Sequence, residues 1–100
     1  MPKGYWIGRV DVINPEGYQA YGVALAEVLR KYGAKFLVRG GTFEAVEGQA
    51  RGRNIVLEFK DHATALACYR SPEYQANIKV RQPHAMVDLV IVEGYDGPQP

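Results

Sequence analysis

The sequence has little of what disulfides, membrane spans and highly charged surfaces require. Cys68 is the one cysteine among 100 residues, so no disulfide can form within the chain. No apolar run approaches the roughly 20 residues of a membrane-spanning helix. Twelve Lys and Arg residues against eleven Asp and Glu give a formal net charge of +1, too small to attract nucleic acid or an anionic membrane. We therefore expect a protein without nucleic-acid or membrane partners, located in the reducing cytoplasm.

The length and the share of apolar residues indicate one folded domain. One hundred residues, 47% of them hydrophobic, are enough for a modest core. The start of the chain, Met1 to Gly4, leads straight into strand-like sequence without the apolar stretch of a signal peptide. We predict a single domain over residues 1–94 and a flexible tail over residues 95–100.

Helix boundaries are marked by short local signals. Asn14-Pro15-Glu16 combines a capping side chain, a proline without an N–H and an acid, which is typical of a helix start. Residues 71–73, Ser-Pro-Glu, repeat this combination. Gly33 is suited to end the first helix in the left-handed conformation.

Apolar periodicity divides the rest of the chain into strands and helices. It predicts strands over residues 5–13, 35–39, 54–60 and 85–94, and helices over residues 15–32, 62–70 and 72–82. Residues 42–47 are expected to resume extended structure, and residues 48–53 to form the hairpin loop.

The order strand–helix–strand, twice, predicts an α+β ferredoxin-like sandwich with βαββαβ topology. We expect a four-stranded antiparallel sheet with the helices on one face. The first and third strands should be central and parallel to each other, and the last strand should pair antiparallel with the first. Right-handed crossovers are the default for such connections.

Each predicted strand has one apolar face and one face that mixes apolar and charged residues. The apolar faces, assigned to the helix side, contain Trp6, Val10, Val12, Phe36, Val38, Ile55, Leu57, Phe59, Val87, Leu89 and Ile91. The mixed face contains Tyr5, Ile7, Leu37, Val56, Met86, Val90 and Val92 beside Arg9, Asp11, Lys35, Arg39, Glu58 and Asp88. Such a face is too apolar to stay in water, so we predict a homodimer with a semi-polar cavity between two facing sheets.

The charged residues of the mixed face form the candidate site. Pairing of the first and last strands brings Asp11 and Asp88 side by side, and the hairpin brings Arg39 near Glu58, with Arg9 on the same face. In one interpretation the cavity binds a small anionic organic molecule, whose charge Arg9 and Arg39 stabilise. Any chemistry would be cofactor-independent, a proton transfer or isomerisation with Asp11 or Asp88 as the base, or a reaction of the oxygenase type. In the alternative the protein is non-catalytic, either ligand-binding or structural, and the charges form only an ion-pair network at the dimer interface.

Two further groups of residues are candidates for ligand contacts. Arg39-Gly40-Gly41 places a guanidinium beside backbone N–H groups that could bind an anion, although the two glycines equally fit a β-bulge. Tyr69 and Tyr74, near the Ser-Pro break, are the phenols expected to donate a hydrogen bond or a proton if any phenol reaches the cavity.

Metal, haem and RNA sites are not expected. His62 and His84 fall outside the mixed face, and no His-x-x-x-His or Glu-x-x-His pair is present, so we predict neither a metal nor a cofactor. Cys68, among alanines, is interpreted as a small buried hydrophobe. Residues 51–59 begin like an RNA-binding signature but lack its stacking aromatics.

Several stretches together resemble a known bacterial family. They are Tyr-Trp-Ile-Gly-Arg-Val-Asp-Val at 5–12, the Asn-Pro-Glu helix start, Lys-Tyr-Gly at 31–33, Phe-Leu-Val-Arg-Gly-Gly at 36–41, Glu-Gly at 47–48, Glu-Phe at 58–59 and Ser-Pro-Glu-Tyr at 71–74. They are similar to domain of unknown function 1330 over about residues 3–94. The resemblance implies a dimeric α/β barrel in which two ferredoxin-like sheets face each other, and it implies no activity. The wider barrel superfamily includes cofactor-independent oxygenases, lactone isomerases, haem-handling proteins and stress-response proteins, and likeness of fold does not choose among them.

Overall fold

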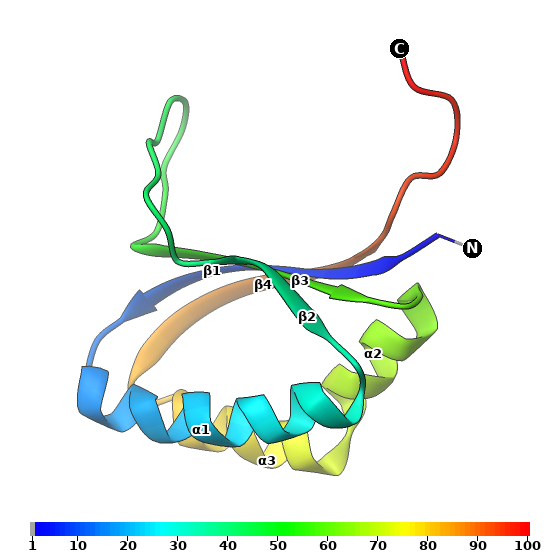
Figure 1. The fold of residues 1–100 in the computed structure, drawn as a ribbon. Coiled ribbons are helices and arrows are strands. Elements are labelled where there is room, and N and C mark those ends of the chain that lie inside the picture. Colours follow the sequence, from blue (N-terminus) through cyan, green and yellow to red (C-terminus); the bar gives the residue numbers. More distant parts are fainter. Residues whose placement is uncertain (1) are drawn as a thin grey trace.

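The computed structural model describes residues 2–100 and shows one four-stranded sheet with three helices packed on one of its faces (Figure 1). In chain order the elements are β1 (Gly4–Val12), α1 (Pro15–Lys31), β2 (Lys35–Arg39), β3 (Arg53–Phe59), α2 (His62–Arg70), α3 (Pro72–Arg81) and β4 (Ala85–Glu93). Each of these elements agrees with the predicted range to within one residue at either end. The predicted α+β ferredoxin-like fold is confirmed.

The residues that flank α1 determine where it begins and ends. The Asn14 side chain accepts a hydrogen bond from the Gly17 N–H at 3.4 Å, and Pro15 occupies the first helical position. After the helix, Gly33 adopts a φ of 68°, a conformation that a side chain disfavours. Both predicted signals are confirmed.

One residue joins α2 to α3. The Ser71 hydroxyl donates to the Cys68 carbonyl at 2.7 Å and accepts from the Tyr74 N–H at 3.2 Å, so it closes α2 and caps α3 together. At the start of α2, Asp61 accepts from the Thr64 N–H at 2.7 Å. Because only Ser71 separates α2 from α3, the chain changes direction there while both helices stay on the same side of the sheet (Figure 1).

The strand order across the sheet is β2-β3-β1-β4, and every neighbouring pair is antiparallel. Gly4 lies opposite Phe59 and Val10 opposite Arg53, so the prediction that the first and third strands are parallel is wrong. The connections explain the error, because the α1 crossover returns β2 in the direction of β1 and the chain then reverses into β3. The predicted antiparallel pairing of β1 with β4 is confirmed.

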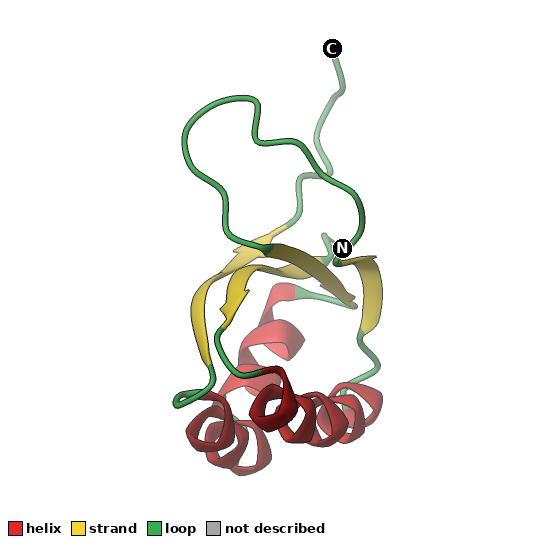
Figure 2. Ribbon diagram, turned by 90° about the vertical axis from the view of Figure 1, so that its left-hand side faces the viewer, coloured by secondary structure: helices red, strands yellow, loops and turns green. Residues whose placement is uncertain are grey.

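The core lies between the sheet and the helices (Figure 2). Trp6 of β1 packs edge-on against Tyr74 at a ring-centroid distance of 5.0 Å, and its Nε1 donates to the Ala65 carbonyl at 2.9 Å. Leu57 and Phe59 of β3 are buried in the same cluster. Burying each such side chain stabilises the fold by about 1.5–3 kcal/mol. This packing holds all three helices on one side and leaves the other side of the sheet uncovered.

A β-bulge interrupts β2. Phe36 pairs with Leu57, but the next pair is Val38 with Val56, so Leu37 is an extra residue without a partner in β3. Because side chains alternate between the two faces of a strand, one extra residue exchanges the faces of all residues that follow it.

The bulge reverses the predicted orientation of two residues. Val38 faces the uncovered side and is 39% exposed, so its prediction as a core residue is wrong. Arg39 pairs with Ile55 and faces the helices, so its prediction as a residue of the mixed face is also wrong.

Residues 41–50, which we term the arm, leave the sheet on the side away from the helices (Figure 1). All of them are exposed and none belongs to a strand, so the prediction that residues 42–47 resume extended structure is wrong. Gly40 and Gly41, with φ of 72° and 83°, turn the chain away from β2. The chain after β4 leaves the same side at the other end of the sheet (Figure 1). No helix in residues 2–100 is long and apolar enough to cross a membrane.

Candidate functional site

The side of the sheet away from the helices, here the open face, exposes large apolar side chains. Ile7, Val38, Met86, Val90 and Val92 are between 39% and 58% exposed. A single chain rarely leaves such a group in water. The prediction that this mixed face carries large apolar residues without cover from its own chain is therefore confirmed for residues 2–100.

A charged cluster of Asp11, Arg51 and Asp88 lies at one end of the open face, beside the base of the arm. Arg51 donates from Nη1 to Asp11 Oδ2 and from Nε to Asp88 Oδ2, each at 2.8 Å. The Gly52 N–H donates to Asp11 Oδ1, also at 2.8 Å. The two aspartates are thus brought together as strand pairing predicts, but by an arginine that the sequence reading did not single out.

The antiparallel pairing of β1 with β3 is the feature from which the position of Arg51 beside Asp11 could have been predicted. Antiparallel pairing places Val10 opposite Arg53, and Arg51 two residues earlier therefore lies beside the end of β1 and Asp11. If β1 and β3 were parallel, as predicted from the sequence, the start of β3 and Arg51 would lie at the opposite end of β1, far from Asp11.

The charged cluster favours the ionised form of Asp11. The Gly52 N–H and the Arg51 guanidinium lower the pKa of Asp11, and the hydrogen bonds of Asp88 and Asp11 raise the pKa of Arg51. An ionised aspartate that already binds an arginine is a weak base, and the bound arginine has little charge left for another anion. The arrangement favours the interface-network interpretation of Asp11 and Asp88 over the catalytic one.

The other charged residues of the open face lie outside this cluster. Arg9 lies opposite Asp88 in the β1–β4 register, yet Arg9 forms no ion pair among residues 2–100. Glu58 pairs with Lys35 at 3.6 Å. The predicted approach of Arg39 to Glu58 is wrong, because the bulge turns Arg39 to the opposite side of the sheet.

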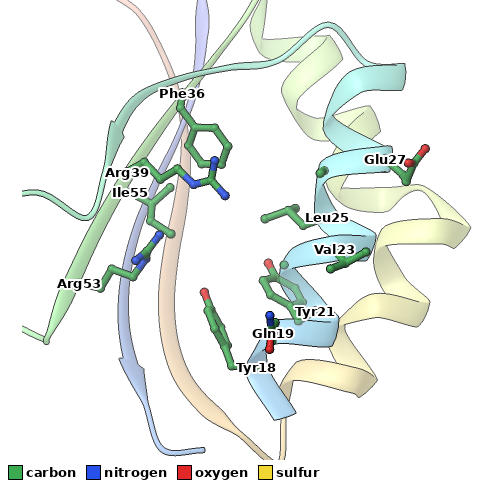
Figure 3. Close-up of a pocket in the computed structure, with 12 residues that line it drawn as sticks. Tyr18, Gln19, Tyr21, Val23, Leu25, Glu27, Phe36, Arg39, Arg53 and Ile55 are labelled. Atoms are coloured by element: carbon green, nitrogen blue, oxygen red, sulfur yellow. The ribbon is translucent and has the colours of Figure 1, made fainter. Parts of the chain in front are cut away.

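A second site, the helix-side pocket, lies between α1 and the sheet edge formed by β2 and β3 (Figure 3). It is a cavity of about 550 Å³, within the usual range for small-molecule sites. It is lined by Tyr18, Gln19, Tyr21, Gly22, Val23, Leu25, Ala26, Glu27, Phe36, Arg39, Arg53 and Ile55. Aromatic and aliphatic side chains form most of its wall, and the two arginines point from the strands toward α1 (Figure 3).

The helix-side pocket is open because α1 presents small residues opposite β2. Gly22 and Ala26, four residues apart on α1, both line the pocket. A Cβ atom added at Gly22 would meet no atom within 4 Å. A glycine inside a helix costs about 1 kcal/mol relative to alanine. The helix therefore gives up stability at the place where the pocket opens.

Arg39 and Arg53 are the cationic groups of the helix-side pocket. The Arg39 guanidinium stacks on the Phe36 ring, 4.6 Å from its centroid. Among residues 2–100 neither arginine forms an ion pair, and Arg53 Nε is buried without a hydrogen-bond partner. The carboxylate in the lining, Glu27, pairs instead with Arg30 at 3.2 Å. Two guanidiniums without carboxylate partners form a site suited to an anion.

Tyr18 adds a neutral hydrogen-bond donor to the same pocket. Burial raises the pKa of its phenol, with a smaller contribution from Tyr21, so the hydroxyl stays protonated near neutral pH. In Figure 3 the phenol extends from α1 into the space in front of Arg53. The sequence reading assigned Tyr18 to the apolar stripe of the helix and missed this role. The available signal was Gly22, a poor helix former within the same stripe.

Tyr69 and Tyr74, the phenols proposed from the sequence, both lie on the helix side of the sheet. Tyr74 is 1% exposed, and its hydroxyl lies 2.8 Å from that of Tyr21 and accepts from Arg81 Nη1 at 3.1 Å. Tyr69 packs edge-on against Trp6 at 6.1 Å. Neither reaches the open face, because α2 and α3 use both rings to pack against β1.

The remaining predicted positions are occupied by structural contacts. The Gly40 N–H donates to the Asn54 carbonyl at 2.9 Å, which favours the bulge-and-turn interpretation of the two glycines over an anion-binding nest. Cys68 is buried, and burial raises the pKa of its thiol to about 12. Within residues 2–100, no group of three or more His, Cys, Asp or Glu side chains is placed to hold a metal ion.

Solved structures share this fold at low sequence identity. A protein of unknown function from Rhodopseudomonas palustris is 18% identical with a TM-score of 0.76, over 96% of this chain and 85% of that one. SnoaB, a cofactor-independent oxygenase from Streptomyces nogalater, is 11% identical with a TM-score of 0.64, over 100% and 97%. A dimeric ferredoxin-like protein of unknown function from Thermobifida fusca is 14% identical with a TM-score of 0.59, over 92% and 89%. At these identities the likeness concerns the fold alone.

The family of the chain is shown by its sequence. No curated protein matches it. Residues 3–95, which include every strand and helix of the fold, match the family described as domain of unknown function (DUF1330). The match contains the arm, the charged cluster and both arginines of the helix-side pocket, and it agrees with the resemblance seen in the sequence. The chain therefore belongs to the DUF1330 family.

Proposed function

We propose that this protein binds a small organic anion, such as an aromatic acid or a keto acid, in the helix-side pocket. The observation that carries the proposal is the pair Arg39 and Arg53, which face a cavity of about 550 Å³ and have no carboxylate partner among the described residues. A guanidinium offers N–H donors in a plane that matches a carboxylate or an enolate. Arg53 Nε has no hydrogen-bond partner, and a turn of the side chain toward the cavity would let a bound oxyanion satisfy this donor.

The walls of the helix-side pocket favour a ligand with a flat apolar body. Phe36 and Tyr18 provide rings from opposite sides of the cavity, and Leu25 and Ile55 line it between them (Figure 3). Apolar surface supplies most of the binding energy in pockets of this kind, while a few polar groups fix the orientation. We expect the anionic group of the ligand at the two arginines and its apolar body between the rings.

We assign the open face to self-association rather than to the ligand. Its charged cluster has two aspartates for one arginine, a formal net charge of −1, and Arg51 is already bound to both of them. Its exposed apolar residues are the kind of surface that a second copy covers in a symmetric homodimer. The dimeric neighbour from Thermobifida fusca supports this assignment. The charged cluster then acts as an interface network, the alternative that the sequence left open.

Binding is better supported than catalysis. A proton-transfer reaction needs a base within hydrogen-bond reach of the ligand. Glu27, the carboxylate of the lining, has a side chain that is 76% exposed and paired with Arg30, so it is poorly suited to this role. The fold of the oxygenase SnoaB is compatible with cofactor-independent chemistry on this scaffold. In such a reaction Arg39 and Arg53 would stabilise an enolate.

The proposal is tested by titrating ¹⁵N-labelled protein with benzoate and phenylpyruvate and following the amide shifts. We expect the shifts to concentrate on α1, β2 and β3. Arg39→Gln and Arg53→Gln should each weaken binding by roughly 10-fold or more, since each removes a charge-assisted hydrogen bond.

Arg9→Gln is the matched control, because it removes the same charge from the open face. It should leave the affinity unchanged. Weakening by Arg9→Gln, with no effect of the two pocket variants, would place the ligand between the sheets and overturn the proposal. Absence of binding by either acid would count against the ligand class.

A further inference from the structure

The arm makes no visible contribution to the fold of its own chain. Among the described residues, no ion pair or side-chain hydrogen bond involves residues 41–50. Two large apolar side chains of the arm, Phe43 and Val46, are 47% and 80% exposed. The whole connection between β2 and β3, residues 40–52, contains no helix or strand, and connections of about this length in a compact domain are usually either functional or linker segments.

The base of the arm is nevertheless held firmly. At its start the Gly40 N–H donates to the Asn54 carbonyl, and at its end Arg51 binds Asp11 and Asp88. These contacts direct the arm away from the helices, as two views show (Figure 1 and Figure 2). The C-terminal segment rises from the same side at the other end of the sheet (Figure 1). The open face is therefore bordered at both ends by projecting chain.

The open face alone is small for a stable interface. Its longest strands have 9 residues, so at about 3.3 Å per residue and about 4.8 Å between four strands its projected area is at most roughly 570 Å². Specific interfaces bury about 800 Å² of accessible surface on each partner, and the accessible surface of a sheet face exceeds its projected area because the side chains stand out from it. Phe43, 47% exposed, has about 100 Å² left to bury on a scale of about 200 Å² for an aromatic side chain, and Val46 adds to it. The arm thus adds apolar surface to an interface whose sheet part is near the lower end of the usual size.

We propose that the arm of each copy packs on a second copy of the chain, against the apolar residues of its open face. Phe43 and Val46 are the contact residues, and Arg51 is a positioning residue that sets the direction of the arm. The inference rests on the homodimer assigned above, and it adds that exchanged arms hold the dimer rather than flat sheet contact alone.

Sedimentation equilibrium of the full chain tests whether the arm contributes to the stability of the dimer. Phe43→Ser with Val46→Ser should raise the dimer dissociation constant roughly 100-fold, because each of two arms loses two apolar contacts. Val80→Ser, on α3 and 41% exposed, is the control for loss of an exposed apolar residue and should leave the dimer unchanged. An unchanged dissociation constant in the double variant overturns the inference. Neither substituted arm residue belongs to the core, so the fold should persist.

A spin label tests the location. Val46→Cys is labelled with a nitroxide, while buried Cys68, with its thiol pKa raised to about 12, stays unreacted. The labelled chain is mixed with ¹⁵N-labelled wild type. Broadening of the Ile7 and Val90 amides supports the exchanged arm, and broadening confined to the helices or no broadening in a dimer overturns it.

The failures of the two proposals are distinguishable. A wild-type chain that sediments as a monomer at micromolar concentration refutes the dimer and the arm together, and leaves anion binding in the helix-side pocket unaffected. A wild-type dimer that tolerates the double variant refutes the arm alone.

Discussion

A larger side chain on α1 that fills part of the helix-side pocket tests whether the ligand binds there, and it leaves both arginines in place. We expect Gly22→Leu to weaken the binding of benzoate and to raise the stability of the fold. The new side chain enters free space, because a Cβ at Gly22 meets no atom within 4 Å. If each of its four carbon groups takes up about the 30 Å³ of a water molecule in the liquid, the side chain fills about 120 Å³ of a cavity of about 550 Å³. Gly22 lines the same pocket as Arg39 and Phe36, so this volume is taken from the space next to the expected anion site.

The expected gain in stability follows from helix propensity. Leucine is better than glycine in a helix interior by about 0.8 kcal/mol, and partial burial in the pocket adds a few tenths. A gain of about 1 kcal/mol raises the Tm of a domain of this size by about 4–8 °C. Loss of binding together with a higher Tm cannot be attributed to unfolding.

Thermal unfolding followed by circular dichroism and calorimetric titration with benzoate measure the two effects. Ala20→Leu, on an exposed position of α1 that does not line the pocket, is the control and should bind benzoate as the wild type does. A lower Tm for Gly22→Leu would mean that the space is not free. Unchanged affinity with a raised Tm would refute the assignment of the ligand to this pocket.

Three further predictions concern the cluster, the thiol and the core. Because the folded-state pKa of Asp11 is lowered, its contribution to stability is present above its unfolded pKa and is lost as pH falls through the folded value, so wild-type Tm should drop below about pH 4. Arg51→Gln should flatten that part of the pH profile, and an unchanged profile would contradict the ion-pair argument. Cys68, with its thiol pKa raised to about 12, should react with a disulfide reagent at pH 8 only after unfolding in urea. Trp6→Phe should lower the free energy of unfolding by about 1–3 kcal/mol, because it leaves the Ala65 carbonyl without its buried donor, and a neutral result in urea titration would show that water replaces it.

Local signals in the sequence predicted the elements of this fold well. The caps at Asn14 and Ser71 bind N–H groups three residues away, so everything they need is contained in a short stretch of chain. The positive φ at Gly33 is equally local. Signals of this kind depend on backbone sterics and on short hydrogen bonds, and tertiary packing does not alter them here.

The side of the sheet on which each strand residue lies was less predictable. Side chains alternate along a strand, so one missed bulge gives the wrong side for every residue after it. The sequence places Leu37 in an unbroken strand, and only the pairing with β3 reveals that it is an extra residue. The exchange of Val38 with Arg39 follows from that one position. It moved an arginine from the expected site on the open face to the helix-side pocket, where Arg53 joins it.

The contacts of Arg51 show a second limit. They depend on the direction of β3 relative to β1 and on the path of a loop, neither of which is encoded in periodicity. A correct rule for strand direction would have placed Arg51 near Asp11, since two strands joined by a hairpin must run in opposite directions. The distances to both aspartates still required the structure.

The hydrogen bond from the Gly40 N–H to the Asn54 carbonyl connects the end of β2 to β3, and it also lies between the helix-side pocket and the arm. Arg39 precedes Gly40 and Arg53 precedes Asn54 in the chain. The short backbone segment that this hydrogen bond closes therefore carries both arginines of the helix-side pocket and adjoins both ends of the arm. Under the two proposals above, an anion held by either guanidinium and a second copy that holds the arm would both act on this short backbone segment. Ligand affinity and dimer affinity would then be linked, and linkage of this kind is reciprocal. The two proposals together predict that addition of a small acid shifts the assembly state of this chain of 100 residues, without any chemical reaction.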